Sequence, residues 1–167
     1  MEVFSSSNSP FSIVNHRLVG GGVIHVVCEK NRRGLGEPDM IILHYTGGTS
    51  AMSSAKFLVR PDVKASAHVV IGRDGQVIQL VPFNIEAWHA GKSSYGGRCE
   101  LNHYSIGIEL DNLGQLRLEG GKFVAECGRE VPVKDVYTED SGEMPTYWHD
   151  YTDVQMQVLN EVCGLLV

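Results

Sequence analysis

The fold and the site follow from one stretch of the sequence, Met40-Ile41-Ile42-Leu43-His44-Tyr45-Thr46-Gly47-Gly48. A short apolar run that ends at turn residues predicts a buried central strand. Because side chains alternate between the two faces of a strand, His44 shares its face with Ile42 and Thr46. His44 also ends the run, at the rim of the predicted sheet. It is therefore either a hydrogen-bonded core histidine or part of a site.

The overall composition fits a single domain. The chain has 167 residues, enough for a hydrophobic core, and its 19 glycines indicate many turns. The formal net charge is −6 and the basic residues are scattered, so the sequence predicts no nucleic-acid partner. No apolar stretch approaches bilayer-spanning length, and residues 1–10 lack the basic start and apolar core of a secretory signal. We therefore expect no membrane partner and a cytoplasmic location, with release by cell lysis as the alternative.

The cysteines indicate a reducing compartment. They are few and far apart, and none forms a C-x-x-C pair: Cys28, Cys99, Cys127 and Cys163. This spacing excludes a thiolate zinc site and a disulfide scaffold. We expect four reduced thiols.

Strands and helices alternate along the rest of the chain. A helix is predicted over Ser50–Arg60, and Thr152 begins a second one with Gln155 in a capping box. Strands are predicted at Val23–Cys28, Ser66–Ile71, Gln76–Val81 and Tyr104–Leu110, with a β excursion over Leu113–Asp135 and an irregular segment over Val136–His149. This order predicts an α/β or α+β fold with a mixed central β-sheet flanked by helices.

Polar residues interrupt three of the apolar strands. Glu109 is the most informative, because an unpaired charge in mid-strand is costly to bury and needs a partner or a cleft. It is part of a structural ion pair or part of a site. His68 precedes three β-branched residues, and we interpret it as a hydrogen-bonded structural histidine. His149 lies in the segment predicted to be irregular, and we expect it to be exposed.

The loop residues Trp88-His89-Ala90-Gly91 have two interpretations. An aromatic ring beside a histidine and a glycine makes a flat, polar-edged surface suited to a sugar or a peptide. The alternative is a packed tryptophan that anchors the loop.

Four stretches in a fixed order resemble a known enzyme family. They are Ile41–Thr46, Ser66–Gly75, Ala87–Gly91 and Ser105–Asn112, with the sequences ILHYT, SAHVVIGRDG, AWHAG and SIGIELDN at their centres. The sequence resembles the zinc-dependent N-acetylmuramoyl-L-alanine amidases of the amidase-2 type, whose fold is shared with phage lysozyme-type amidases and peptidoglycan recognition proteins. The resemblance runs from about residue 38 to the end of the chain.

The resemblance implies an enzyme that cuts the amide between N-acetylmuramic acid and L-alanine of a peptidoglycan fragment or muropeptide. It implies zinc as the cofactor, His44 as a zinc ligand and Glu109 as the general base. It also implies a substrate groove with Trp88, His89, Tyr45 and Asn112 as binding residues. Ala67 stands where phage-type members have a tyrosine, so the general-base role falls to Glu109.

The sequence departs from the family after the last predicted helix. The family places a second zinc histidine, a basic residue and a third ligand there, and no such run occurs in this sequence. We therefore expect an N-terminal extension over residues 1–22 and one C-terminally incomplete, monomeric amidase domain over residues 23–167, inactive by itself. The alternatives are a non-catalytic muropeptide-binding module and an enzyme that acts on another amide.

Overall fold

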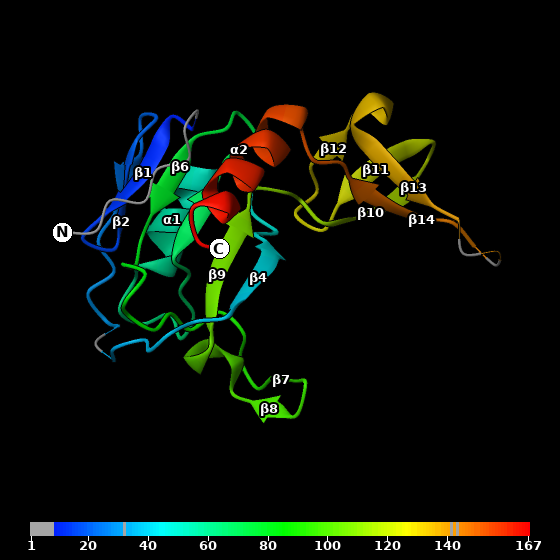
Figure 1. Cartoon of the computed structure of the whole chain (residues 1–167). Coiled ribbons are helices and arrows are strands. Elements are labelled where there is room, and N and C mark those ends of the chain that lie inside the picture. The colour runs from blue at the N-terminus through cyan, green and yellow to red at the C-terminus, as the bar shows by residue number, and fades with distance from the viewer. Residues whose placement is uncertain (1–8, 32, 141, 143) are drawn as a thin grey trace.

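The computed structural model describes residues 9–31, 33–140, 142 and 144–167, and its main element is a mixed sheet (Figure 1). In the described chain this sheet has the order β3-β6-β5-β9-β4. Its strands are β3 (Ile24–His25), β6 (Val77–Gln79), β5 (Val69–Ile71), β9 (Ser105–Leu110) and β4 (Met40–Tyr45). Strand β9 runs parallel to both β4 and β5, whereas β5 and β6 are antiparallel. The predicted fold class is confirmed.

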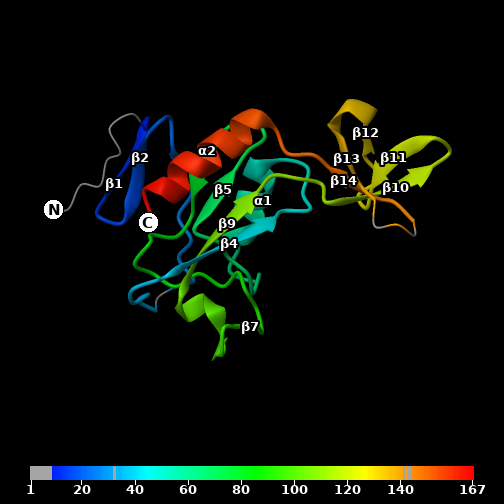
Figure 2. The same cartoon turned by 45° about the vertical axis from the view of Figure 1, so that its right-hand side comes forward.

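One helix covers each face of this sheet (Figure 2). Helix α2 (Asp153–Gly164) packs Leu159 and Val162 on a core with Val69 and Ile108. Helix α1 (Ala51–Leu58) packs on a separate core on the other face, which contains Val70 and Ile78. Neighbouring residues of β5 therefore belong to different cores, as the period of two in a strand requires.

Both predicted helices begin at their predicted caps. The Ser50 side chain accepts a hydrogen bond from the Ser53 N–H, and Thr152 accepts one from the Gln155 N–H. The Gln155 side chain, which would make the second bond of the predicted capping box, has other partners. Gln155 is fully buried, and its Nε2 donates to the carbonyl oxygens of Ile71 at 2.9 Å and Asp111 at 3.2 Å. Its side chain therefore ties α2 to the sheet instead of closing the cap.

The prediction of a buried central strand at Met40–Tyr45 is wrong. Strand β4 pairs with β9 and forms the edge of the sheet in the described chain. Leu43 and Tyr45 are each 49% exposed. An apolar run predicts a strand, but strand order is set by pairing between distant segments, which local pattern does not contain.

A second sheet stands to one side of the first and is drawn in yellow to orange in Figure 1. Its strands are antiparallel and have the order β12-β11-β10-β14-β13. They are β10 (Gln115–Glu119), β11 (Lys122–Ala125), β12 (Glu130–Val131), β13 (Val136–Glu139) and β14 (Thr146–His149). A short 3-10 turn, η2 (Val133–Asp135), precedes β13. Leu116, Ala125 and Val131 form a small core of its own.

The prediction of an irregular segment over Val136–His149 is therefore wrong. Strands β13 and β14 pair over four residues each, from Val136↔His149 to Glu139↔Thr146. The segment is polar, but its strand residues are mostly β-branched or aromatic, and such residues favour a pleated, half-buried surface. His149 is 9% exposed, so its predicted exposure is also wrong.

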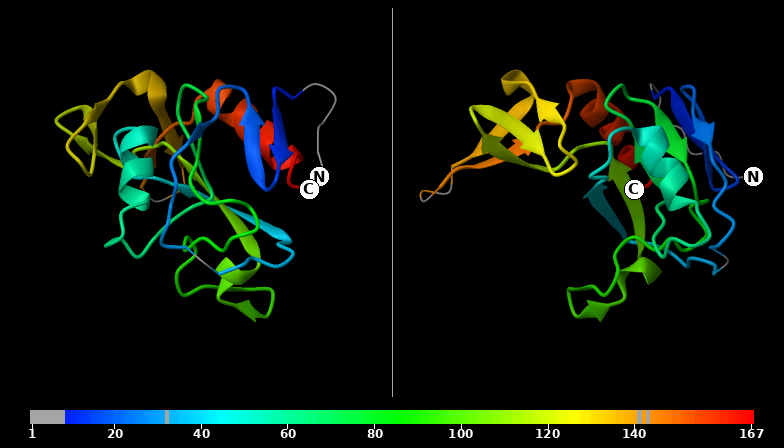
Figure 3. Two further views of the ribbon diagram at one scale, coloured as in Figure 1. Left: turned by 90° about the vertical axis from the view of Figure 1, so that its left-hand side faces the viewer. Right: turned by 180° about the vertical axis from the view of Figure 1, so that it is seen from behind.

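Two hairpins complete the chain. The hairpin of β1 (Phe11–Val14) and β2 (Arg17–Gly20) lies beside α2 (Figure 3). Phe11 and Leu18 belong to the same core as α2. The predicted domain boundary at residues 22 and 23 stays a prediction. The segment before β9 contains a small hairpin, β7 (Ser94–Tyr95) with β8 (Arg98–Cys99), and the 3-10 turn η1 (Leu101–His103).

Two further observations bear on the sequence analysis. All four cysteines are free, with Cys99 and Cys127 exposed and Cys28 buried. Among the residues that the structure describes, no helix is long and apolar enough to cross a bilayer.

We expect Gln155→Ala to lower the free energy of unfolding by about 1–3 kcal/mol, because the Asp111 carbonyl oxygen loses its side-chain donor and the Ile71 carbonyl oxygen keeps only the Asp111 N–H. Urea unfolding followed by circular dichroism measures the change. Gln157→Ala is the matched control, since Gln157 is exposed on the same helix and bonds only Glu161. Equal effects of the two substitutions would contradict the tie between α2 and the sheet.

Candidate active site

Strands β4 and β9 bring His44 and Glu109 together. The two residues are opposite each other in the parallel register of these strands. Opposite residues of a parallel pair point to the same side of the sheet, so His44 and Glu109 share a face. This is the arrangement that the alternation of the two strands predicts. Their roles in chemistry stay predictions.

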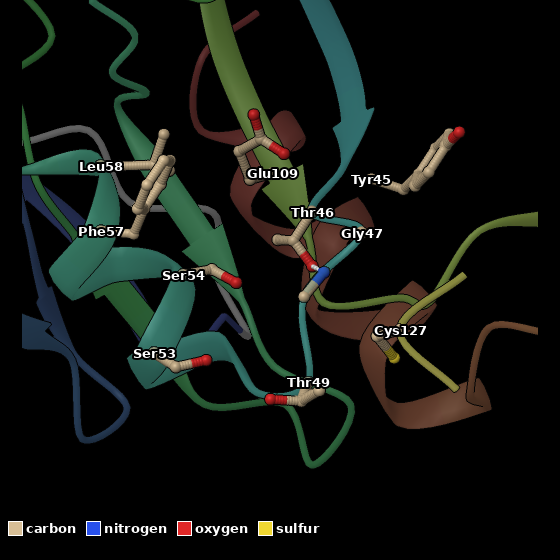
Figure 4. Close-up of a pocket in the computed structure, with 11 residues that line it drawn as sticks. Tyr45, Thr46, Gly47, Thr49, Ser53, Ser54, Phe57, Leu58, Glu109 and Cys127 are labelled. Carbon is tan, nitrogen blue, oxygen red and sulfur yellow. Dashed lines mark hydrogen bonds between the residues drawn. The ribbon is translucent and has the colours of Figure 1, made fainter. Parts of the chain in front are cut away.

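Glu109 forms part of the wall of a cavity of about 380 Å³ (Figure 4). The cavity lies between the end of β4, helix α1 and a turn of the second sheet. Thr46 and Gly48 contribute from the chain after β4, Ser54 and Phe57 from α1, and Cys127 from the second sheet. In Figure 4 the Tyr45 ring points away from Glu109, as expected for the residue after His44 in a strand.

Few interactions compensate for the burial of the Glu109 carboxyl group. Its Oε2 is buried and has no hydrogen-bond partner among the described residues. Burial raises the pKa of Glu109 from 4.5 to about 7. At neutral pH the group is therefore partly protonated and can exchange a proton with a bound molecule. A carboxyl group with these properties in a cleft is a candidate general acid or base.

His44 is oriented by His89. His44 Nε2 and His89 Nδ1 are 3.1 Å apart, and the two rings meet edge to face. His89 Nε2 lies 3.3 Å from Ser105 Oγ, whose own hydroxyl donates to the carbonyl oxygen of Leu101 at 2.6 Å. Ser105 must then accept from His89 Nε2–H, which makes His89 Nδ1 an acceptor in the neutral ring. His44 accordingly donates from Nε2, and its Nδ1 keeps a lone pair.

Both rings are neutral at physiological pH. Burial lowers the pKa of His44, and burial together with the neighbouring His44 lowers that of His89 to about 4. The close packing of His89 requires a glycine below it, because a Cβ on Gly107 would overlap the His89 ring. The small residues on this face of β9 thus make room for the ring beside Glu109.

The described residues do not make a complete zinc site. His44 fits a ligand role, because its Nε2–H is held by a second group and its Nδ1 lone pair is available. A protein zinc site needs about three or four ligands. Among the described residues, no group of three or more His, Cys, Asp or Glu side chains could hold a metal ion.

The loop of Trp88 and His89 is fixed by side chains from elsewhere. Ser66 Oγ accepts from the Trp88 N–H at 2.9 Å. Asn102 Oδ1 accepts from the N–H groups of His89 at 3.0 Å and Ala90 at 2.8 Å. Trp88 is 38% exposed, whereas His89 turns toward the sheet. The substrate-binding roles of both stay predictions, and the contact of His89 with His44 is one that the sequence did not reveal.

The other two predicted binding residues both contact strand β14 of the second sheet. Tyr45 packs edge to face on Trp148, at 6.4 Å between ring centroids. Asn112 is 2% exposed; its Nδ2 donates to the His149 carbonyl oxygen, and its Oδ1 accepts from the Gly114 N–H, each at 2.7 Å. Asn112 therefore holds the second sheet against the first. Substrate binding by either residue stays a prediction.

His68 has the structural role that the sequence analysis favours. It is fully buried, accepts from the Gly107 N–H at Nδ1 and bonds the Ile85 carbonyl oxygen at Nε2. Cys127 and Asn102 are the residues of the site that sequence reasoning missed. Neither has a local signal, since each reaches the site only through the fold.

Comparison with known proteins shows the family to which the chain belongs. The profile of the Amidase_2 family, described as N-acetylmuramoyl-L-alanine amidase, matches residues 34–167. The chain belongs to the Amidase_2 family. Within it, the chain is similar to the 1,6-anhydro-N-acetylmuramyl-L-alanine amidase AmpD of Citrobacter freundii, with 44% identity over 79 residues, which cover 47% of this chain and 42% of AmpD. It is also similar to the N-acetylmuramoyl-L-alanine amidase AmiD of Escherichia coli, with 34% identity over 93 residues, which cover 52% of this chain and 33% of AmiD.

Two solved structures support the same family assignment. Escherichia coli AmiD in complex with anhydro-N-acetylmuramic acid-L-Ala-D-γ-Glu-L-Lys matches with a TM-score of 0.55 at 26% identity, over 78% of this chain and 43% of AmiD. A selenomethionine derivative of AmpD matches with a TM-score of 0.52 at 26% identity, over 85% of this chain and 72% of AmpD. The chain spans less than half the length of the curated amidases that it matches.

We expect the stability of the Amidase_2 domain to fall as pH rises through the titration of Glu109. Between pH 4.5 and about pH 7 the unfolded chain releases this proton while the folded chain keeps it, so the folded state loses stability. In metal-free buffer, Glu109→Gln should therefore raise the free energy of unfolding by roughly 2–3 kcal/mol at pH 8 and by little at pH 4.

Urea unfolding at several pH values measures this effect, and Glu119→Gln is the control. Glu119 is an exposed carboxylate on β10, paired with Arg117. A Glu109→Gln effect that is the same at pH 4 and pH 8 would show that the carboxyl group titrates normally.

Proposed function

We propose that this chain supplies the substrate groove and the general base of an N-acetylmuramoyl-L-alanine amidase that acts on muropeptides. The observation that carries the proposal is the buried, unpaired carboxyl group of Glu109 in a cleft, in register with His44. The family and the printed names of the similar enzymes support the reaction and a muropeptide substrate. A cytoplasmic location and a monomeric state belong to the same proposal.

Glu109 has a defined task in this reaction. Water adds to the lactyl carbonyl carbon, the Glu109 carboxylate accepts a proton from that water, and the C–N bond to L-alanine breaks. The same proton then moves from Glu109 to the leaving nitrogen. A pKa of about 7 suits both transfers, because the group neither holds nor releases the proton too strongly at neutral pH. His89 holds His44, and Trp88, which precedes His89 in the loop, is 38% exposed.

We expect Glu109→Gln to lower the turnover of muropeptide cleavage by about a hundredfold or more, the usual effect of a lost general base. The amide keeps the shape of the side chain but does not accept the proton. The assay follows release of the stem peptide by chromatography, with the longest form of the protein that its gene encodes. Glu119→Gln serves again as the exposed control. Normal turnover by Glu109→Gln would exclude the role.

Zinc enters the proposal through the family and through His44. Because the described residues contain no further group for the metal, we expect the 167-residue chain by itself to hold less than one zinc ion per molecule after gel filtration. Elemental analysis measures the content, and His44→Ala should remove what remains. Stoichiometric zinc in the chain would show that its ligands assemble in another way, and the assignment of His44 would need revision.

A non-catalytic muropeptide-binding module is the second candidate. Among the described residues no group of three or more His, Cys, Asp or Glu side chains could hold a metal ion, and a binding module would need none. The two candidates differ in one measurement. An amidase releases stem peptide and loses this activity in Glu109→Gln, whereas a binding module retains its ligand uncleaved with either residue at position 109.

A further inference from the structure

A second cavity lies on the opposite side of β4 from Glu109. It has a volume of about 400 Å³, within the range of about 300–1,000 Å³ that is usual for small-molecule sites. Four aromatic side chains line it: Tyr45, Tyr137, Trp148 and Tyr151. We call this group the aromatic cleft. Glu139 and Asp150 also line it.

The pairing of the two sheets sets the positions of these rings. Tyr137 is directly opposite Trp148 in the antiparallel pair of β13 and β14, so their side chains lie next to each other on one face. The Trp148 ring meets the Tyr45 ring at an interplanar angle of 78°. Gly114 makes this contact possible, because it has a φ of +76° and a Cβ there would overlap the Tyr45 ring.

The aromatic cleft is open to solvent. Tyr45 is 49% exposed, Tyr137 is 55% exposed and Tyr151 is 38% exposed. Large apolar rings that gather on a surface mark a place where another molecule binds. Carboxylates stand among them: Glu139 Oε2 accepts from the Thr146 hydroxyl group at 3.1 Å, and Asp150 Oδ1 accepts from the Tyr151 N–H at 2.8 Å.

The chemistry of the lining selects a class of ligand. A sugar ring has apolar C–H faces that stack on aromatic rings, and hydroxyl groups at its edge that donate to carboxylates and tyrosines. Anions are disfavoured by Glu139 and Asp150. A purely apolar ligand would leave the remaining lone pairs of both carboxylates without partners. A neutral sugar can contact both the aromatic rings and the carboxylates.

The cleft also shares a lining residue with the candidate active site. Tyr45 lines this cavity and the cavity of Glu109, and it directly follows His44 in β4. Tyr137, Trp148 and Tyr151 come from the second sheet and the connection after it. A glycan that begins at the Glu109 cavity would therefore meet the second sheet next.

We propose that the aromatic cleft binds a neutral N-acetylated sugar residue of a glycan, as a subsite separate from the amide that is cleaved. This inference rests on the proposed function, because the sugar is the part of a muropeptide or glycan strand that the cleft would hold.

Fluorescence titration with a β-1,4-linked N-acetylglucosamine tetramer, which carries no peptide, tests the proposal. The chain has two tryptophans, so the Trp88→Phe protein reports on Trp148 alone. We expect a saturable change in Trp148 emission. Tyr137→Ala should weaken the apparent affinity about tenfold, as expected for a lost stacking platform. Tyr95→Ala should leave it unchanged, because Tyr95 is 72% exposed on the β7–β8 hairpin, outside the cleft.

Tyr137→Leu is the control for a loss of structure, because leucine keeps an apolar side chain on β13 but has no flat ring. It should weaken binding as Tyr137→Ala does, with an unchanged melting temperature. An unchanged Trp148 signal, equal affinities of the Tyr137 and Tyr95 variants, or binding of a lysine-rich peptide in place of the sugar would each overturn the proposal. Sugar binding without any muropeptide cleavage would count against the proposed amidase alone, and cleavage without sugar binding against the aromatic cleft alone.

Discussion

Parallel pairing of β4 with β9 places an imidazole and a carboxyl group side by side on one face of the sheet, and the other site contacts depend on this register. A shift by one residue would send His44 to the opposite face and leave Glu109 facing an apolar strand. The register also places Gly107 where the His89 ring needs space, and Ser105 where that ring needs an acceptor. One backbone pairing thus orders the chain of contacts from Ser105 through His89 to His44.

The burial of the Glu109 carboxyl group lowers the stability of the fold, and the same burial would suit the proposed proton exchange. A carboxyl group with a buried, unpaired oxygen is unfavourable, and its raised pKa measures that penalty. The surrounding structure offsets it with groups that are fully satisfied. His68 bonds at both ring nitrogens, and the Asn112 side chain bonds through both its oxygen and its nitrogen. Only Glu109, among these polar groups, is left able to exchange a proton with a ligand.

Local patterns in the sequence predicted the elements and the residues that share a face, because alternation and capping are properties of short segments. They did not predict that β4 is an edge strand or that Gln155 bonds the sheet, because both depend on segments distant in the chain. The inward turn of His89 has the same origin, since Asn102 fixes its backbone from 13 residues away. The strands β13 and β14 were missed for another reason. Their polar composition concealed aromatic and β-branched residues that pair across a hairpin.

The sequence analysis predicted a central strand at β4, whereas its position at the edge of the sheet determines how the two cavities are placed relative to each other. Consecutive residues at the end of an edge strand point to opposite faces, and in the described chain no further strand covers the outer side. His44 therefore shares its face with Glu109, while Tyr45 reaches the aromatic cleft. Gly47 and Gly48, which carry no side chain, line the Glu109 cavity at the end of β4 together with Tyr45. In a central strand the same two residues would lie in regions divided by the sheet. The exposure that a buried-strand interpretation excluded thus allows Tyr45 to line both the Glu109 cavity and the aromatic cleft.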